Sequence, residues 1–201
     1  MTLGVEGQAG ETPKEGDPVF RAIDTRLVGT NREALLASAE KAAELGFKPI
    51  LLSSMITGEA RETAKFYAAL AKEAARYPSA SAKPVCYIGG GETTVTLKGK
   101  GTGGRNQEMA LSFLNEFADE PDLLRGVCFL SAGTDGNDGP TDAAGAFASS
   151  ELLALGRKAG LNTRAFLSEN NSYGYFSPIG GLLMTGPTNT NVCDIHLMIV
   201  T

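Results

Sequence analysis

One glycine-rich stretch, residues 89–108, combines the residue types that bind small anions. It opens with three glycines and an acid, Glu92, and a second glycine cluster ending at Gly104 delivers Arg105. Glycines let a backbone approach a ligand closely, and a guanidinium can bind a carboxylate or phosphate through two hydrogen bonds. A predicted helix start at this point would add N–H groups that favour an anion. We therefore predict part of an active site for a small anionic substrate.

The same stretch formally matches the dinucleotide fingerprint G-x-G-x-x-G at residues 99–104. The match is weak because the chain contains 25 glycines. It also lacks a clean acidic residue at a strand end about 20 positions later. A structural alternative for Arg105 is an ion pair with a surface acid such as Glu108. We favour anion binding, because a solvated helix face would not need the two glycines that precede Arg105.

A second polar loop, residues 131–142, follows an apolar run that is typical of a buried strand. It contains Thr134 and three aspartates, Asp135, Asp138 and Asp142. Carboxylates in such a loop could hold Mg²⁺, orient phosphates or accept a proton from a substrate hydroxyl. The spacing does not fit an EF-hand. The alternative is a plain turn, since Asp, Asn and Gly are common turn residues.

A third polar segment, residues 186–191, lies just before the last apolar run. Asn189 and Asn191 could each present a donor and an acceptor to a hydroxy acid, or they could simply form a turn. The one histidine, His196, lies inside the final apolar run and is read as a core residue. A Ser-His-Asp or Cys-His mechanism is therefore nearly excluded.

The elements that must position these loops alternate between strands and helices. This pattern predicts an α/β fold with a largely parallel sheet and helices on both faces. In such sheets, ligands bind beyond the carboxyl ends of the strands, where the first two loops are expected. Strands are expected at 25–28, 48–53, 85–88, 92–97, 127–131 and 192–200, and helices at 31–46, 58–76, 106–117 and 143–159.

The chain divides into three parts. Residues 1–18 are polar and rich in Gly, Pro and Glu, which is typical of a flexible tail or linker. Residues 19–80 read as a βαβα segment, and residues 81–201 carry most of the predicted site. The boundary is expected near residue 80, in a short segment rich in Pro, Ser and Ala.

Composition excludes several classes of protein. A net charge of −5 gives no electrostatic footprint for nucleic acid. The sequence has no run of about 20 apolar residues, so we expect no membrane span. The first residues do not resemble a secretory signal. Cys86, Cys128 and Cys193 each lie in an apolar run, and we expect three buried, reduced thiols in a cytoplasmic protein.

Four ordered motifs resemble one known family. They are Gly-Gly-Glu-Thr-Thr-Val at 90–95, Gly-Gly-Arg-Asn-Gln-Glu at 103–108, Gly-Thr-Asp-Gly at 133–136 with Gly-Pro-Thr-Asp-Ala-Ala-Gly at 139–145, and Gly-Pro-Thr-Asn-Thr-Asn-Val at 186–192. Together they resemble the C-terminal region of the type-2 glycerate kinases, called the MOFRL domain. Many members of this family are labelled hydroxypyruvate reductases. The resemblance covers nearly the whole chain.

The resemblance implies roles for the residues already selected. Arg105 would anchor the substrate carboxylate or the transferring phosphate, Asp135 would act as base or metal ligand, and Glu92 would help to orient the hydroxyls. These three are the expected catalytic residues. The expected substrate-binding residues are Asn191, Asn189, Thr134 and Gly104, and the expected Mg²⁺ ligands are Asp138 and Asp142.

The resemblance also implies a reaction, phosphorylation of D-glycerate with ATP and Mg²⁺. Family enzymes have an N-terminal Rossmann-like domain that supplies a catalytic lysine, and we expect this sequence to begin after most of that domain. Residues 19–80 would then be a remnant of the inter-domain region. The expected partner is such a domain, on a separate chain or elsewhere in a longer one. The isolated chain is expected to be inactive, and a homo-oligomer is a further expectation.

Two other functions stay open on the sequence. One is an NAD(P)H-dependent hydroxypyruvate reductase with its cofactor at residues 99–104. The other is a non-catalytic binding or assembly module, in which Arg105 and Asp135 would have no role in ligand binding.

Overall fold

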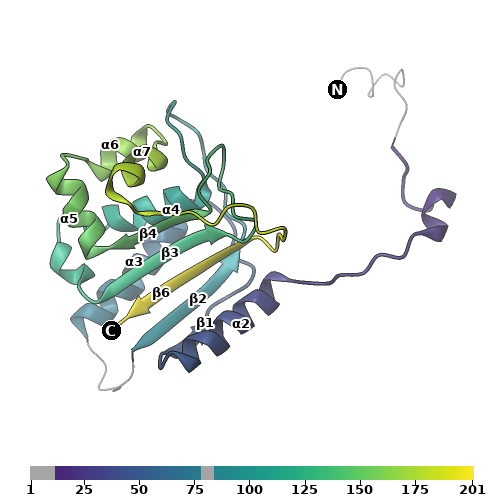
Figure 1. Cartoon of the computed structure of the whole chain (residues 1–201), viewed down its shortest axis with the longest axis horizontal. Helices are drawn as coiled ribbons and strands as arrows, with labels where there is room; N and C mark the ends of the chain where they lie inside the picture. Colours follow the sequence, from purple (N-terminus) through teal and green to yellow (C-terminus); the bar gives the residue numbers. More distant parts are fainter. Residues whose placement is uncertain (1–11, 78–83) are drawn as a thin grey trace.

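A six-stranded sheet in the order β1-β2-β6-β3-β4-β5 organises the structure (Figure 1). The structure is a computed structural model that describes residues 12–77 and 84–201. The strands are β1 (Lys48–Leu51), β2 (Val85–Gly91), β3 (Val127–Gly133), β4 (Gly145–Ser149), β5 (Leu182–Leu183) and β6 (Asp194–Val200).

The sheet is mostly antiparallel, so the expectation of a largely parallel sheet was wrong. Among the six strands of the described residues, only β1 and β2 form a parallel pair. The last strand, β6, lies between β2 and β3 and runs antiparallel to both, and β4 is antiparallel to β3 and β5. For β3 and β4 the reason is local, because a loop without a crossover helix joins them, and only a crossover can make neighbouring strands parallel.

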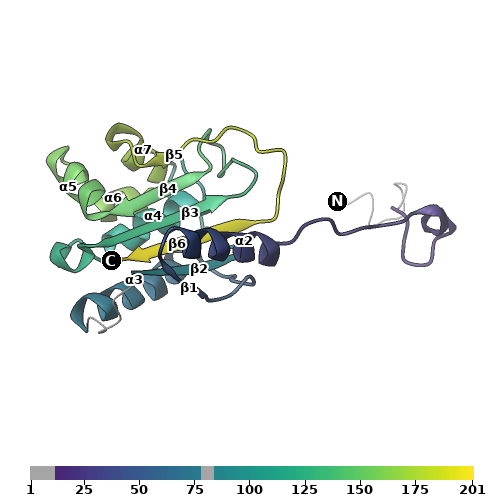
Figure 2. The ribbon, with the colours of Figure 1, turned by 60° about the horizontal axis from the view of Figure 1, so that its bottom comes forward.

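Helices cover both faces of the sheet, as the sequence predicts. The α-helices are α2 (Asn31–Glu44), α3 (Ala60–Arg76), α4 (Arg105–Asn115), α5 (Ser150–Lys158), α6 (Thr163–Ser168) and α7 (Ser172–Phe176), and the 3₁₀ turns are η1 (Pro18–Ala22), η2 (Pro121–Leu124) and η3 (Ser177–Ile179). Figure 2 shows α2 lying over β2 and β6. On the opposite face, α4 packs on β3 and β4, with α3 beside it. No helix in the described part of the chain is long and apolar enough to cross a bilayer.

Three predicted elements differ from the structure. Residues 25–28 form no strand, and Leu27 and Val28 are 83% and 97% exposed on an arm that extends away from the sheet (Figure 1). The segment 92–97 has a single isolated bridge, from Thr94 to Glu59. The predicted helix 143–159 is β4 followed by α5. The strand was missed because its alanines, Ala146 and Ala148, also suit a helix.

A core of aromatic side chains lies between the sheet and the α3–α4 layer. Phe129 of β3 is fully buried and stacks on Phe113 of α4 with ring centroids 4.6 Å apart. The ring centroid of Tyr67 of α3 lies 5.0 Å from that of Phe129. A smaller core on the other face packs α2 against β2, with Leu35 and Cys86 buried in it. These two layers fix the sheet on which the polar loops depend.

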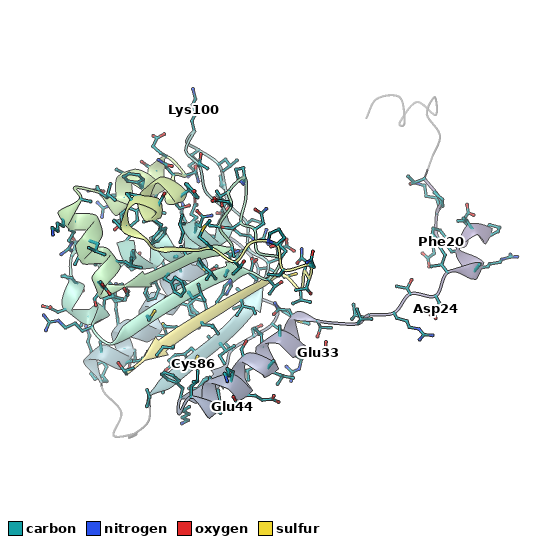
Figure 3. All side chains as sticks on the ribbon, in the orientation of Figure 1. Phe20, Asp24, Glu33, Glu44, Cys86 and Lys100 are labelled. Carbon is teal, nitrogen blue, oxygen red and sulfur yellow. The ribbon has the colours of Figure 1, made fainter. Side chains whose placement is uncertain are left out.

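The cysteines only partly match the expectation of three buried thiols. Cys86 is buried beneath α2 (Figure 3), but Cys128 is exposed and Cys193 is partly exposed. Cys128 is paired in register with Ile199, which faces the α2 side of the sheet. It is exposed because α2 packs mainly on β1, β2 and β6 and leaves β3 uncovered on this face.

The predicted domain division stays a prediction. Residues 31–77 contribute α2, β1 and α3 to the same sheet and cores as the rest of the chain. The expected boundary near residue 80 lies outside the described residues, as do residues 1–11 of the predicted tail. Phe20 and Asp24, in the segment that follows, lie on the extended arm (Figure 3).

The three predicted site loops meet at one edge of the sheet although the sheet is mostly antiparallel. Because β2 and β3 both run opposite to β6, their carboxyl ends and the start of β6 meet at one edge. In the registers of these pairs, Asp194 lies between Gly91 of β2 and Gly133 of β3. The loops that follow β2 and β3 and the loop that precedes β6 therefore gather around this point.

Truncating the central aromatic ring tests this packing. We expect Phe129→Ala to lower the free energy of unfolding by about 3–5 kcal/mol, because it removes a fully buried ring and leaves a cavity. Urea unfolding followed by circular dichroism measures the change. Leu27→Ala on the exposed arm is the control and should change stability by less than about 0.5 kcal/mol. Equal losses in both variants would contradict the assignment of the core.

Candidate functional site

Four predicted site residues come together at the edge of the sheet where β2, β3 and β6 meet. Glu92 follows β2, Asp135 follows β3, Asn191 precedes β6, and Arg105 begins α4. Arg105 Nη2 lies 3.5 Å from Glu92 Oε1. Asn191 Nδ2 donates to Asp135 Oδ2 at 3.4 Å. The sequence thus selected residues that are distant in the chain and neighbours in the fold.

A buried carboxylate that the sequence analysis missed holds Arg105 in place. Arg105 Nε and Nη2 donate to the two oxygens of Asp194 at 2.6 and 3.0 Å, and Asp194 is fully buried. This hydrogen-bonded pair raises the pKa of Arg105 and keeps the guanidinium charged. The proposed alternative partner, Glu108, instead pairs with Arg61 at 2.6 Å. The signal that could have pointed to Asp194 is an acid at the start of an otherwise apolar strand.

The geometry leaves part of the Arg105 guanidinium available to a ligand. Arginine has five N–H donors, and Asp194 occupies one on Nε and one on Nη2. The side chain remains 33% exposed, and the exposed acid Glu92 stands near Nη2. The Nη1–Nη2 side of the guanidinium can therefore bind a planar carboxylate or a phosphate.

The first turn of α4 is already capped by a carboxylate of the protein. Asp138 Oδ1 accepts from Asn106 N at 3.0 Å, and Oδ2 accepts from Gln107 N at 2.9 Å. Asp138 is only 2% exposed, and burial raises its pKa while these hydrogen bonds oppose the rise. Two of the N–H groups expected to attract a substrate anion are therefore already used, and the expectation was wrong for them. Gly104, the N-cap residue, lies against Asp138.

Asn106 connects this cap to the ion pair. Its Nδ2 donates to Asp194 at 3.0 Å and to Asp138 at 3.3 Å, while its Oδ1 accepts from Ser131 at 2.6 Å. All four side chains are buried. One network therefore joins β3, β6, α4 and the loop after β3, and the sequence analysis missed both Asn106 and Ser131 as its members.

The two predicted metal ligands have different surroundings. Asp138 caps α4, whereas Asp142 is exposed and accepts a hydrogen bond from Tyr173 at 3.0 Å. Within residues 12–77 and 84–201, no group of three or more His, Cys, Asp or Glu side chains is placed to hold a metal ion. Binding of Mg²⁺ by Asp138 and Asp142 therefore stays a prediction.

Threonines tie the loop before β6 to the loop after β3. Thr134 Oγ1 donates to Cys193 O at 2.7 Å and accepts from Val192 N at 2.8 Å. Thr188 Oγ1 donates to Thr134 O at 2.5 Å. Asn191 forms a turn as well as facing Asp135, because its Oδ1 accepts from Cys193 N at 3.0 Å.

Two of the predicted substrate-binding residues differ in their surroundings. The hydroxyl of Thr134 makes the hydrogen bonds to Cys193 and Val192 described above. Asn189 is exposed and has a positive φ of 60°. That backbone conformation suits an asparagine in a turn. Its role in binding substrate stays a prediction.

The glycines at 99–104 have a packing role. A Cβ added at Gly99 or Gly101 would collide with Glu169 or Asn171. One at Gly104 would collide with Asp138. Protein atoms therefore occupy the space that a dinucleotide fingerprint would leave for a pyrophosphate.

Asn170 holds this loop on the body of the protein. Its Oδ1 accepts from Lys98 N at 2.7 Å and Gly99 N at 2.9 Å, and its Nδ2 donates to the buried Glu108 at 2.9 Å. Lys100 projects from the tip of the loop, away from the sheet (Figure 3). The sequence analysis missed Asn170, whose φ of 51° is one that asparagine tolerates better than most residues.

A hollow of about 630 Å³ adjoins the polar edge on the α2 side. Its walls are mainly apolar and include Ala34, Leu183 and Ile195. It shares Thr134 and Val192 with the loop contacts described above. A ligand in the hollow would therefore lie next to the polar cluster.

His196 is a core residue, as expected. It is fully buried, and its Nδ1 lies 3.3 Å from the hydroxyl of Tyr67. Burial lowers its pKa from 6.5 to about 4, because the charged imidazolium would lose its hydration.

The histidine predicts a loss of stability in mild acid. Above pH 6.5 it is neutral in both states. As the pH falls toward 4, only the unfolded chain takes up the proton, so the folded state loses roughly 3 kcal/mol. Urea unfolding across this range should show a larger loss for the wild-type protein than for His196→Gln. Identical pH profiles would contradict the buried, neutral state.

The cap on α4 gives a second prediction for this site. We expect Asp138→Asn to lower the free energy of unfolding by about 1–2 kcal/mol, because the two backbone N–H groups bond to different carboxylate oxygens and the NH₂ that replaces one of these oxygens cannot accept. Asp142→Asn, at the exposed aspartate of the same loop, is the matched control. Thermal or urea unfolding of the two variants measures the change in stability. A decrease in the control as large as in Asp138→Asn would contradict the assignment of Asp138 as the helix cap.

Comparisons with known proteins cover nearly the whole chain. A glycerate 2-kinase of Pyrococcus horikoshii is 39% identical over 199 residues, which is 98% of this chain and 43% of the relative. A D-glycerate 2-kinase of Thermotoga maritima is 37% identical over 190 residues, 94% of this chain and 44% of the relative. The chain therefore spans less than half the length of these curated relatives.

The fold agrees with solved structures. The crystal structure of a glycerate kinase from Thermotoga maritima matches with a TM-score of 0.80 at 37% identity, over 88% of this chain and 42% of that one. These similarities confirm the resemblance to glycerate kinases drawn from the four motifs. The model of the MOFRL family matches residues 85–194, more than half of the chain. The sheet edge with Arg105, Asp194 and their neighbours thus lies within that match, and the chain belongs to the MOFRL family.

Proposed function

We propose that this chain forms part of a kinase that transfers a phosphoryl group from ATP to D-glycerate with Mg²⁺. The observation that carries the proposal is a partly exposed guanidinium, that of Arg105, fixed by Asp194 at the sheet edge where the loops that carry Asp135 and Asn191 also meet. An anchored cation next to a carboxylate suits binding of a hydroxy acid and removal of its hydroxyl proton. Relatives named glycerate kinase support this choice of substrate.

Each residue has a role in the proposed reaction. Arg105 binds the substrate carboxylate or the transferring phosphate through its Nη1–Nη2 side. Asp135 accepts the proton from the attacking hydroxyl, and Asn191, which lies 3.4 Å from it, orients that hydroxyl. Glu92, close to Arg105, binds a second substrate hydroxyl.

The charge of the cluster supports a role for Mg²⁺. One guanidinium, that of Arg105, interacts with three carboxylates, those of Asp194, Glu92 and Asp138. Glycerate and ATP would bring further negative charge to the same place. Phosphoryl transfer needs that charge neutralised, so we propose that Mg²⁺ and cationic side chains from outside this chain complete the site.

The adjoining hollow gives a place for part of the nucleotide. Its volume of about 630 Å³ is in the usual range for small-molecule sites. If the adenine ring of ATP lay among the apolar walls near Leu183, the phosphates would extend past Thr134 to the polar edge. The chain covers less than half of the kinases it resembles, and we propose that the rest of such an enzyme forms the opposite wall. The chain alone would then be inactive.

The reductase alternative loses its structural support at residues 99–104, since protein atoms fill the space beside the glycines. It predicts that nicotinamide fluorescence changes when NADH is added to the chain. The binding-module alternative predicts that Arg105→Ala and Asp135→Ala leave all ligand binding unchanged.

A coupled ADP-release assay tests the proposal. This chain, D-glycerate, ATP and Mg²⁺ should give activity when mixed with the complementary folded part of a related glycerate kinase. Arg105→Lys should lower the rate about 10²-fold or more, because lysine keeps the charge but loses the planar two-donor contact. Arg125→Lys, at an arginine whose side chain is 80% exposed, should match the wild-type rate. No activity in the wild-type mixture would contradict the proposal.

A further inference from the structure

We propose that Asp194 is a positioning residue, which sets the direction in which Arg105 presents its guanidinium to an anionic ligand. This inference rests on the proposed function, because it assigns the ligand-binding role to Arg105. Asp194 itself is fully buried and would not touch the ligand. Its effect would pass through the two hydrogen bonds to Arg105.

The position of Asp194 is determined by the sheet. It is the first residue of β6, and it is paired in register with Gly91 on one side and Gly133 on the other. Its Oδ1 also accepts from Asn106 Nδ2 at 3.0 Å, so α4 holds the carboxylate from the same side as Arg105. The backbone ladder and the third donor together leave the carboxylate little freedom to rotate.

A fixed carboxylate selects one orientation of the guanidinium. The two bonds at 2.6 and 3.0 Å use Nε and Nη2 of Arg105, which places Nη1 and the outer N–H of Nη2 away from the buried network. Arg105 begins α4, and two glycines precede it. Neither glycine has a side chain that could hold the guanidinium in place. The side chain thus depends on Asp194 for its direction.

Glu92 marks the side on which the ligand would enter. It is 60% exposed, and its Oε1 lies 3.5 Å from Nη2, longer than a hydrogen bond. A substrate carboxylate or phosphate could take the Nη1–Nη2 side, with Glu92 moving into solvent. Asp194, buried and hydrogen-bonded to both Arg105 and Asn106, would stay in place.

The alternative is that Asp194 contributes to the stability of the fold and has no effect on ligand binding. The same helix offers a matched control, because Glu108 is also buried, at 2% exposed, and also pairs with an arginine, Arg61, at 2.6 Å. Glu108→Gln should destabilise the fold in a comparable way. It lies outside the proposed ligand contacts, so it should leave ligand affinity unchanged.

The first experiment compares Asp194→Asn with Glu108→Gln and the wild-type chain. Binding of inorganic phosphate and of D-glycerate is measured by titration calorimetry, and the folded fraction is checked by circular dichroism. We expect Asp194→Asn to weaken binding about 10- to 100-fold, because a misdirected donor loses its geometry. Glu108→Gln should bind like the wild-type chain. Equal affinity in Asp194→Asn and the wild-type chain would overturn the positioning role.

A second measurement needs no variant and applies even if Asp194→Asn does not fold. In ¹⁵N-labelled wild-type protein, the Nε–H proton of Arg105 should exchange with water more slowly than that of the exposed Arg125. Adding phosphate should shift the Nη signals of Arg105 and leave its Nε–H slow. Faster exchange at Nε on binding would mean that the ligand displaces Asp194, and the inference would be wrong.

The outcomes separate the two proposals. Binding by the wild-type chain with no loss in Asp194→Asn overturns the positioning role and leaves the proposed function standing. No binding of either probe by the wild-type chain, with no shift at Arg105, overturns the positioning role, and the ADP-release assay of the mixture then decides the proposed function separately.

Discussion

The buried contact between Asp194 and Arg105 is the interaction on which the candidate site depends. Burying a carboxylate away from water costs free energy unless charged or polar groups donate hydrogen bonds to it. Here the guanidinium supplies two hydrogen bonds and Asn106 supplies a third. Removing one partner of such a pair typically lowers the free energy of unfolding by about 3–5 kcal/mol. The Arg105 side chain that contributes to this stability is also the one proposed to contact the ligand. This double dependence explains why β3, β6, α4 and the loop after β3 all meet at one network.

The sheet topology makes that meeting possible. By entering between β2 and β3 in the opposite direction, β6 brings its first residue to the edge where those two strands end. A parallel strand in the same place would present its last residue there. The loop before β6 would then lie at the far edge of the sheet. The antiparallel arrangement therefore joins residues near position 92, near 135 and near 191 in one cluster.

The sequence predicted the clustering better than the sheet. Glu92, Asp135 and Asn191 could be selected because polar residues next to apolar runs are visible in a sequence. Strand direction was not predictable, because apolar runs look the same whether neighbours are parallel or antiparallel. Asp194 was missed because its partner Arg105 is 89 residues away. The glycines at 99–104 were open to two readings, because a close approach by a ligand and one by the protein's own backbone require the same residue.

The fit of those glycines has a consequence for how the family can vary. Gly99, Gly101 and Gly103 lie against the segment at 169–172 without space for a side chain on any of the three glycines. The loop at 99–104 and this segment are about seventy positions apart, and Asn170 joins them. A side chain on one of these glycines would push the segment at 169–172 out of its place. In comparing members of the family, the glycines would therefore record an internal steric contact, and a shared glycine pattern would say nothing about which cofactor a member uses.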